Sequence, residues 1–119
     1  MIFSAGIDIV YIKRLMESVN DNAFLNRLLT DREREHIFTK RDPYRHLAGR
    51  FAAKEAVMKA LGTGWDKGVG WRDIEIVNMP SGRPIPLLHS RAALLSQNKK
   101  VLLSLSYAKD IAVAFAIVE

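Results

Sequence analysis

Hydrophobic positions alternate with a period of two at the start of the chain. Residues 1–10 are mostly apolar and β-branched, a composition that favours a β-strand. The odd positions form one wholly apolar face, made of Phe3, Ala5, Ile7 and Ile9. The even positions form a mixed face that contains Asp8. The pattern therefore predicts a strand with an aspartate inside it, where aspartate is normally disfavoured.

Short helical segments follow this strand. Residues 11–19 and 22–29 are each predicted to form a short helix. Thr30 and Glu33 have the spacing of a capping box, in which each residue satisfies a backbone N–H group of the other. This box predicts a third short helix that ends near Phe38.

A longer helix is marked at both ends by its terminal residues. Asp42 followed by Pro43 is a strong start signal, because aspartate caps helices and proline fits their first turn. The helical pattern runs to Leu61, and Gly62 can close the helix in a left-handed conformation. One helix much longer than its neighbours is therefore expected.

The second half of the chain is richer in strands. In order, the pattern predicts a loop at 62–70, a strand at 73–78, a turn at 80–84, a helix at 87–97, and a hairpin of strands at 101–107 and 111–118. One strand, several helices and then a mainly antiparallel sheet with one inserted helix indicate an α+β fold. The 119 residues are enough for one compact domain and not for two.

The composition is that of an ordinary globular protein. With 49% hydrophobic and 26% charged residues, the chain is too apolar to be disordered. Its longest apolar run, at 111–118, is too short to cross a membrane, and the N-terminus lacks a signal-peptide pattern. The sequence has no cysteine, which suits a reducing compartment. We therefore expect a cytoplasmic protein without a membrane partner.

The charge balance points to an anionic partner. The formal net charge is +5, which favours nucleic acid, a phosphorylated small molecule or an acidic protein. Nucleic acid is disfavoured among these, because the basic residues are spread over helices that also carry acids and lack an aromatic stacking platform.

Two carboxylates stand out as candidate metal ligands. Asp8 lies in an apolar strand, where a buried carboxylate needs a partner, a metal ion or a proton; a strand-end aspartate paired with a lysine or exposed to solvent is the alternative. Glu55 lies on the long helix one turn before Lys59, and a solvated Glu–Lys pair is the alternative there. Together Asp8 and Glu55 can hold Mg²⁺, which takes one or two carboxylates with phosphate oxygens and water. Lys59 would then point at the same phosphates.

Two further features of the long helix bear on a phosphate site. Lys54 falls in the middle of the apolar stripe, so it must either extend to solvent or meet an anion. The glycine-rich segment 62–70 can bring backbone N–H groups close to a phosphate, although a helix cap followed by turns explains it equally well. The histidines show no metal-ligand spacing.

Several segments, in matching order, resemble one enzyme family. They are Gly6-Ile7-Asp8-Ile9-Val10, Arg50-Phe51-Ala52-Ala53-Lys54-Glu55-Ala56 with its continuation Lys59-Ala60-Leu61-Gly62-Thr63-Gly64, Asp73-Ile74-Glu75-Ile76 and Gly82-Arg83-Pro84. They span nearly the whole chain and resemble the small phosphopantetheinyl transferases, the holo-acyl-carrier-protein synthases. The resemblance implies a single transferase domain at residues 1–119. It also implies Mg²⁺-dependent transfer of phosphopantetheine from coenzyme A to a carrier-protein serine, with release of adenosine 3′,5′-bisphosphate.

The resemblance also implies roles for single residues. Asp8 and Glu55 match the family's magnesium ligands, and Lys59 matches the lysine on the coenzyme A phosphates. The remaining positions of its coenzyme A site are Arg50, Lys54, Gly62, Thr63, Gly64, Gly82, Arg83, Pro84 and Ser106. The family's small members are trimers with sites shared between subunits, so a homotrimer is expected. The general base is open between Glu55 and a water molecule on the metal.

One position departs from the family. Its members commonly have Ser-x-Ser/Thr-His near the penultimate strand, whereas this chain has Tyr107 after Ser106. Tyrosine can donate a hydrogen bond but carries no positive charge near neutral pH. The change is expected to weaken the binding of a coenzyme A phosphate more than the reaction itself.

A carrier protein is acidic and suits this basic chain. Lys13, Arg14 and Arg27 are candidates for its docking surface, with solvated helix charges as the alternative. A non-catalytic module that only binds coenzyme A or carrier protein is a second possible function, disfavoured by the presence of both carboxylates and Lys59. Whether the carrier serves fatty-acid synthesis or another pathway is left open.

Overall fold

The computed structural model describes residues 1–19, 22–62 and 68–119. The elements in chain order are β1 (Ser4–Tyr11), α1 (Ile12–Ser18), α2 (Asn22–Leu28), α3 (Asp31–Phe38), α4 (Pro43–Leu61), the 3-10 helix η2 (Trp71–Asp73), β2 (Ile74–Asn78), β3 (Pro84–Leu88), α5 (Ser90–Ser96), β4 (Val101–Ala108) and β5 (Ile111–Val118). No helix in these described parts of the chain is long and apolar enough to cross a membrane. The expected α+β fold is confirmed.

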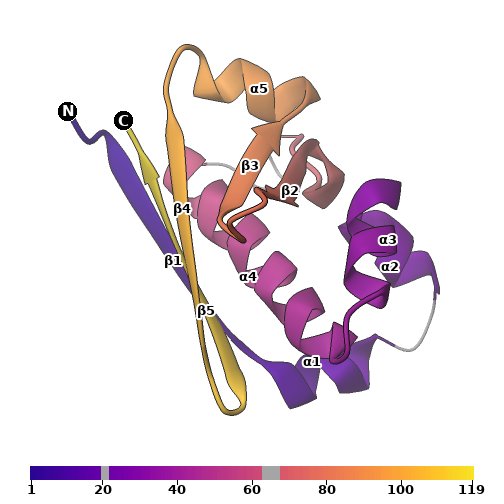
Figure 1. The fold of residues 1–119 in the computed structure, drawn as a ribbon. Helices are drawn as coiled ribbons and strands as arrows, with labels where there is room; N and C mark the ends of the chain where they lie inside the picture. The colour runs from indigo at the N-terminus through magenta and orange to yellow at the C-terminus, as the bar shows by residue number, and fades with distance from the viewer. Residues whose placement is uncertain (20–21, 63–67) are drawn as a thin grey trace.

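The strands form two antiparallel sheets. β5 lies between β1 and β4 in a three-stranded sheet, and β2 pairs with β3 in a separate hairpin. In Figure 1 α4 crosses the inner face of the larger sheet, while α2, α3 and the β2–β3 hairpin lie on the opposite side of α4. The long helix is therefore the element that both layers share.

Small residues let α4 lie close to the sheet. The inward positions of β5 are Ala112, Ala114 and Ala116, all fully buried. A Cβ atom on Gly6 of β1 would collide with the carbonyl oxygen of Ala56 on α4. Glycine is thus required at this crossing, and the close approach brings the polar side chains of β1 next to those of α4.

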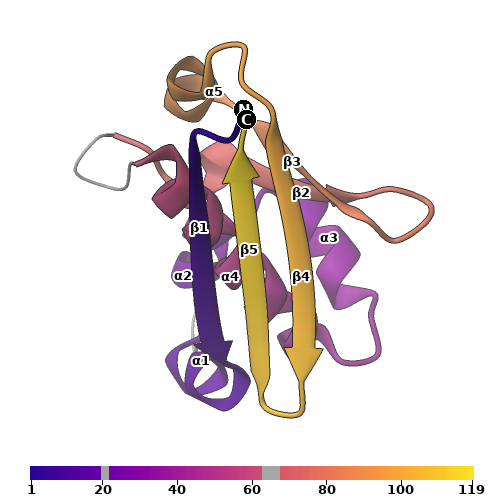
Figure 2. The same ribbon diagram turned by 90° about the vertical axis from the view of Figure 1, so that its left-hand side faces the viewer.

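The two faces of β1 have different surroundings. The mixed face packs against α4, whereas the apolar odd face points away from the protein core. On that outer face Ile7 and Ile9 are 54% and 57% exposed. Figure 2 shows this outer face of the β1–β5–β4 sheet uncovered by any helix.

The ends of the helices follow the sequence signals. Thr30 and Glu33 form the reciprocal capping box that opens α3. The Asp42 carboxylate accepts a hydrogen bond from the backbone N–H of Arg45, and Gly62 ends α4 with φ of 69°. These predictions are confirmed, because the capping chemistry is local to each helix end.

One element was predicted wrongly. The turn expected to end at Pro84 gives way to strand β3, and the inserted helix begins at Ser90, three residues after the expected Leu87. Pro84 and Pro86 lack N–H donors and therefore hide the strand pattern. β3 tolerates both prolines because, among the strands that the structure describes, it is hydrogen-bonded to β2 alone and is an edge strand.

Candidate active site

A groove between β1, α1 and α4 brings together the two predicted metal ligands. It has a volume of about 500 Å³, and both Asp8 and Glu55 line it. Asp8 reaches it from the inner face of β1, and Glu55 from the side of α4 that borders α1 and β1. Residues far apart in the sequence thus meet because β1 runs alongside α4.

Lys59 completes this group of charges. Its Nζ donates to Asp8 Oδ1 at 3.0 Å and to the carbonyl oxygen of Ile7 at 2.9 Å. The Lys59 side chain is 54% exposed and that of Asp8 17%. The ammonium places a positive charge at the groove. It contacts Oδ1 of Asp8, so the other carboxylate oxygen, Oδ2, is not engaged by Lys59.

Glu55 is half-buried beside a second carboxylate. Burial raises its pKa, and the nearby Asp8 charge raises it further, while hydrogen bonding to Trp71 and the Lys59 charge lower it. Two carboxylates that repel one another at one groove suit a hard divalent cation with oxygen ligands. Within the described residues no larger cluster of metal-ligand side chains occurs, so phosphate oxygens and water would supply the other ligands of Mg²⁺.

Lys54 lies away from this groove. Its side chain is fully buried, and its ammonium donates to Glu33 Oε1 at 2.6 Å and to the carbonyl oxygen of Leu28. Burial lowers the pKa of Lys54, and the Glu33 carboxylate opposes that shift. The lysine therefore does not extend to solvent; it meets the Glu33 carboxylate inside the protein. Its ammonium is not available to a ligand in this chain.

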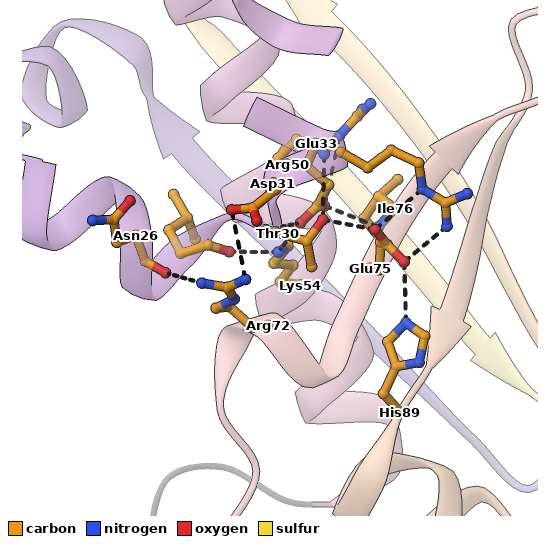
Figure 3. A network of polar contacts seen from close by, with 12 residues as sticks. Asn26, Thr30, Asp31, Glu33, Arg50, Lys54, Arg72, Glu75, Ile76 and His89 are labelled. Carbon is orange, nitrogen blue, oxygen red and sulfur yellow. Dashed lines mark hydrogen bonds and ion pairs between the residues drawn. The ribbon is translucent and has the colours of Figure 1, made fainter. Parts of the chain in front are cut away.

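Glu33 is the centre of a polar network that the sequence did not predict (Figure 3). Besides Lys54, its carboxylate accepts the backbone N–H groups of Thr30 and Ile76, each at 2.9 Å. It thereby connects α3, α4 and β2. The sequence signal for Glu33 was the capping box alone, which says nothing about partners on other elements.

Arg50 is buried next to the same network. Its terminal nitrogen donates to Asn78 Oδ1 at 2.7 Å. Its Nε lies 3.8 Å from Glu33 Oε2 and has no hydrogen-bond partner among the described residues. It lines a cavity of about 190 Å³ together with Arg32 and His36. This cavity is separate from the groove of Asp8 and Glu55.

The other expected coenzyme A positions are spread over the molecule. Gly62 caps α4 just beyond Lys59, whereas Thr63 and Gly64 lie outside the described residues. Arg83 and Pro84 line a second groove of about 370 Å³ with residues of β4 and β5. Figure 2 shows the β2–β3 hairpin beside β4, at the sheet edge opposite β1.

The remaining β4 and β2–β3 positions lie near that opposite edge. Gly82 forms the hairpin turn with φ of 93°, a conformation that favours glycine. Ser106 is exposed on the outer face of β4. A single chain therefore does not bring these positions to the groove of Asp8 and Glu55.

Tyr107 lies on the inner face of β4 against the start of α4. Its hydroxyl group occupies the space where a Cβ atom of residue 49 would be, so Gly49 is needed for this packing. The guanidinium group of Arg45 lies 4.6 Å from the centre of the Tyr107 ring. Burial raises the pKa of Tyr107, which keeps its hydroxyl group protonated.

One of the three candidate docking residues borders the groove. Arg14 on α1 lines it together with Asp8 and Glu55, and its guanidinium group lies 5.2 Å from the centre of the Tyr11 ring. Lys13 lies on the same helix, and Arg27 lies in the last turn of α2. Arg14 is thus the basic candidate placed at the two carboxylates.

Comparison with known proteins agrees with this arrangement. Residues 4–116 match the model of the 4′-phosphopantetheinyl transferase superfamily. The chain is 40% identical to a protein of Protochlamydia amoebophila named holo-[acyl-carrier-protein] synthase, over 98% of both chains.

Solved structures are similar over the same length. A holo-[acyl-carrier-protein] synthase from Neisseria meningitidis has a TM-score of 0.88 and 37% identity, covering 100% of this chain and 99% of its own. One from Bacillus anthracis, in complex with coenzyme A (3′,5′-ADP), has a TM-score of 0.85 and 37% identity, covering 100% and 97%. The match of sequence, length and fold shows that this chain belongs to the 4′-phosphopantetheinyl transferase superfamily.

Proposed function

We propose that this protein is a holo-acyl-carrier-protein synthase, which transfers 4′-phosphopantetheine from coenzyme A to a serine of an acyl carrier protein. The observation that carries the proposal is the meeting of Asp8, Glu55 and Lys59 at one groove. Two carboxylates and an ammonium suit a magnesium–pyrophosphate group, as the relatives' use of coenzyme A requires. We expect the reaction to take place in the cytoplasm, in agreement with a chain that contains no cysteine.

In this reaction the serine oxygen bonds to the β-phosphorus of coenzyme A. The bond from that phosphorus to the bridging oxygen breaks, adenosine 3′,5′-bisphosphate leaves, and the serine proton passes to water directly or through Glu55. Mg²⁺ held by Asp8 and Glu55 would neutralise charge on the pyrophosphate. Lys59 adds a fixed positive charge at the leaving group, and the groove orients the two substrates.

The coenzyme A site is proposed to be completed by a neighbouring copy of the chain. Arg83, Pro84 and Gly82 lie at the β4 edge of the sheet, while Asp8 lies on β1 at the opposite edge. A second copy placed with its β4 edge beside β1 would supply Gly82–Pro84, Ser106 and Arg50 to a pocket that already holds Asp8, Glu55 and Lys59. Lys54 is left out of this pocket because its ammonium is bonded to Glu33 and to the carbonyl oxygen of Leu28 inside the protein.

The outer sheet face is suited to that assembly. None of the outward positions of β1, β4 and β5 is charged, and Phe115 is 40% exposed at the centre of this face. A largely apolar and uncharged face of this kind suits an interface with another protein. We propose that two further copies cover it, so that the enzyme is a homotrimer with shared sites.

The carrier protein is proposed to dock on α1 and α2. Arg14 lies at the groove, where it can contact acidic side chains that flank the carrier serine. Lys13 and Arg27 extend the basic surface. The carrier of fatty-acid synthesis is the proposed acceptor.

The test is the intact mass of an apo-acyl carrier protein after incubation with this protein, coenzyme A and magnesium. A gain of about 340 Da, the mass of one phosphopantetheine unit, that is absent with EDTA supports metal-dependent transfer. No gain, with coenzyme A binding intact, would instead support the non-catalytic binding module. A carrier variant with its serine replaced by alanine is the control for the acceptor group.

A further inference from the structure

The indole ring of Trp71 lies against Glu55 at the groove. Its Nε1–H group donates to Glu55 Oε1 at 3.4 Å, at the long end of hydrogen-bond distances. Trp71 comes from the 3-10 helix η2, sixteen residues after Glu55, so this contact is not a consequence of helix spacing. Only Oε1 is engaged by this bond, which leaves Oε2 for another partner.

An aromatic cluster holds the indole in place. The Trp71 ring lies 5.6 Å from the rings of both Phe24 on α2 and Phe51 on α4, measured between centroids. Phe51 is one helical turn before Glu55 and lines the same groove. The ring therefore packs on the face of α4 that presents Glu55.

Hydrogen bonds also fix the backbone of η2 at both of its ends. The Asp73 carboxylate accepts the backbone N–H of Gly70 at 2.9 Å, and the Asp73 carbonyl oxygen accepts the backbone N–H of His89 at 2.8 Å. Arg72 donates to the carbonyl oxygen of Asn26 at 3.2 Å. A donor on such a fixed turn has little freedom to follow the Glu55 side chain, so the carboxylate must adapt to the indole.

We propose that Trp71 is a positioning residue that orients the Glu55 carboxylate for divalent-cation binding. The inference rests on the proposed metal site of Asp8 and Glu55. Two neighbouring carboxylates repel one another, and without a second contact Glu55 can rotate away from Asp8. The indole N–H holds one oxygen and directs the other into the groove. Hydrogen-bond partners behind metal ligands commonly contribute 10–100-fold to metal affinity.

The test is Trp71→Phe, which keeps an aromatic ring in the cluster and removes the N–H donor. The readout is Mn²⁺ binding to the full chain, followed by electron paramagnetic resonance of the free ion, with Mg²⁺ competition. We expect Mn²⁺ affinity to fall by about tenfold. The matched control is Phe24→Leu, which loosens the packing around the indole but keeps its N–H donor, and it should lower Mn²⁺ affinity much less than Trp71→Phe does. Circular dichroism and thermal unfolding check that both variants are folded.

A double-mutant cycle distinguishes an effect of Trp71 on the Glu55 carboxylate from a general loosening of the fold. In a Glu55→Gln background, Trp71→Phe should cause no further loss of Mn²⁺ affinity, because the two residues act through the same carboxylate. An equal loss in both backgrounds, or an equal loss in Phe24→Leu, overturns the positioning role.

Different results would contradict the role of Trp71 and the proposed metal site. Wild-type binding that depends on Glu55 but is unchanged in Trp71→Phe overturns the role of Trp71 alone. Mn²⁺ binding that is the same in wild type and Glu55→Gln overturns the metal site at Glu55, and the role of Trp71 with it.

Discussion

The ammonium of Lys54 lies 2.6 Å from the carboxylate of Glu33, and both side chains are fully buried between α3 and α4. Lys54 directly precedes Glu55 in the sequence of α4, yet its side chain faces the protein interior and not the groove. Its pair with Glu33 connects the helix that carries Glu55 and Lys59 to the second layer of the fold.

Breaking this buried pair should destabilise the protein strongly. Lys54→Met is expected to lower the free energy of unfolding by about 3–5 kcal/mol, because it leaves the Glu33 carboxylate buried without its cation. Urea unfolding would measure the loss, with Lys40→Met on an exposed lysine as the control. The double variant with Glu33→Gln should lose less than the sum of the two single variants. Additive losses would contradict a direct interaction.

The stability of the protein should fall in acid because of Glu75. Hydrogen bonds from Arg32, first, and from Thr30 and His89 lower its pKa from 4.5 to about 2. A carboxylate with a lowered pKa in the folded state stabilises the protein above its unfolded pKa, and this contribution is lost as the pH falls from about 4.5 toward 2. At 1.36 kcal/mol per pH unit the loss is up to about 3 kcal/mol, less where solvent screens the exposed Arg32.

Urea unfolding at pH 7, 4.5 and 2.5 would measure this effect. Glu75→Gln should be less stable than the wild type at pH 7 and should approach it at pH 2.5. A constant difference between the two proteins over this range would show that Glu75 is not the group responsible.

Asp8 should be needed for transfer and not for folding. Asp8→Ala is expected to reduce magnesium-dependent transfer by two to three orders of magnitude, about the loss seen when a group that stabilises transition-state charge is removed. Its thermal unfolding should change little, because its ion pair with Lys59 is partly exposed. Intact-mass assay of the carrier protein gives the rate. Full activity in a folded Asp8→Ala protein would remove Asp8 from the site.

Charge reversal at Arg14 should affect only one of the two substrates. Arg14→Glu is expected to raise the KM for carrier protein about tenfold or more and to leave the KM for coenzyme A nearly unchanged, with the effect weakening at high salt. The control is Arg91→Glu on α5, at the other end of the molecule from α1 (Figure 1). Equal changes in both KM values would argue against docking at Arg14.

A shared site predicts that two inactive variants can restore one another. Asp8→Asn and Arg83→Glu change residues at opposite edges of the sheet and should each be nearly inactive. Co-expressed, they should form mixed trimers with one site each that receives an intact Asp8 from one subunit and an intact Arg83 from the next, or roughly a quarter of all sites after random assembly. Light scattering would check the trimer. If verified mixed trimers show no recovery of transfer activity, Asp8 and Arg83 do not contribute to one shared site.

Much of the candidate site could be inferred before the structure was known. An aspartate within an apolar strand and a Glu–Lys pair on a capped helix are unusual enough to single out Asp8, Glu55 and Lys59. The structure brings these three together at one groove. Trp71 was missed because no spacing rule relates it to Glu55, and Lys54 was assigned to the ligand because its buried partner belongs to another helix.

By itself, the sequence determined the local structure of this protein. Hydrophobic periods and capping residues act within a few positions along the chain, so they specify α3, α4 and the terminal strands directly. Only the tertiary structure decided which face of β1 is buried, that Lys54 meets Glu33, and that Gly82–Pro84 lies across the sheet from Asp8. These features depend on contacts between segments that are distant in sequence, and such contacts arise when a close approach such as that of Gly6 to α4 fixes how the layers pack.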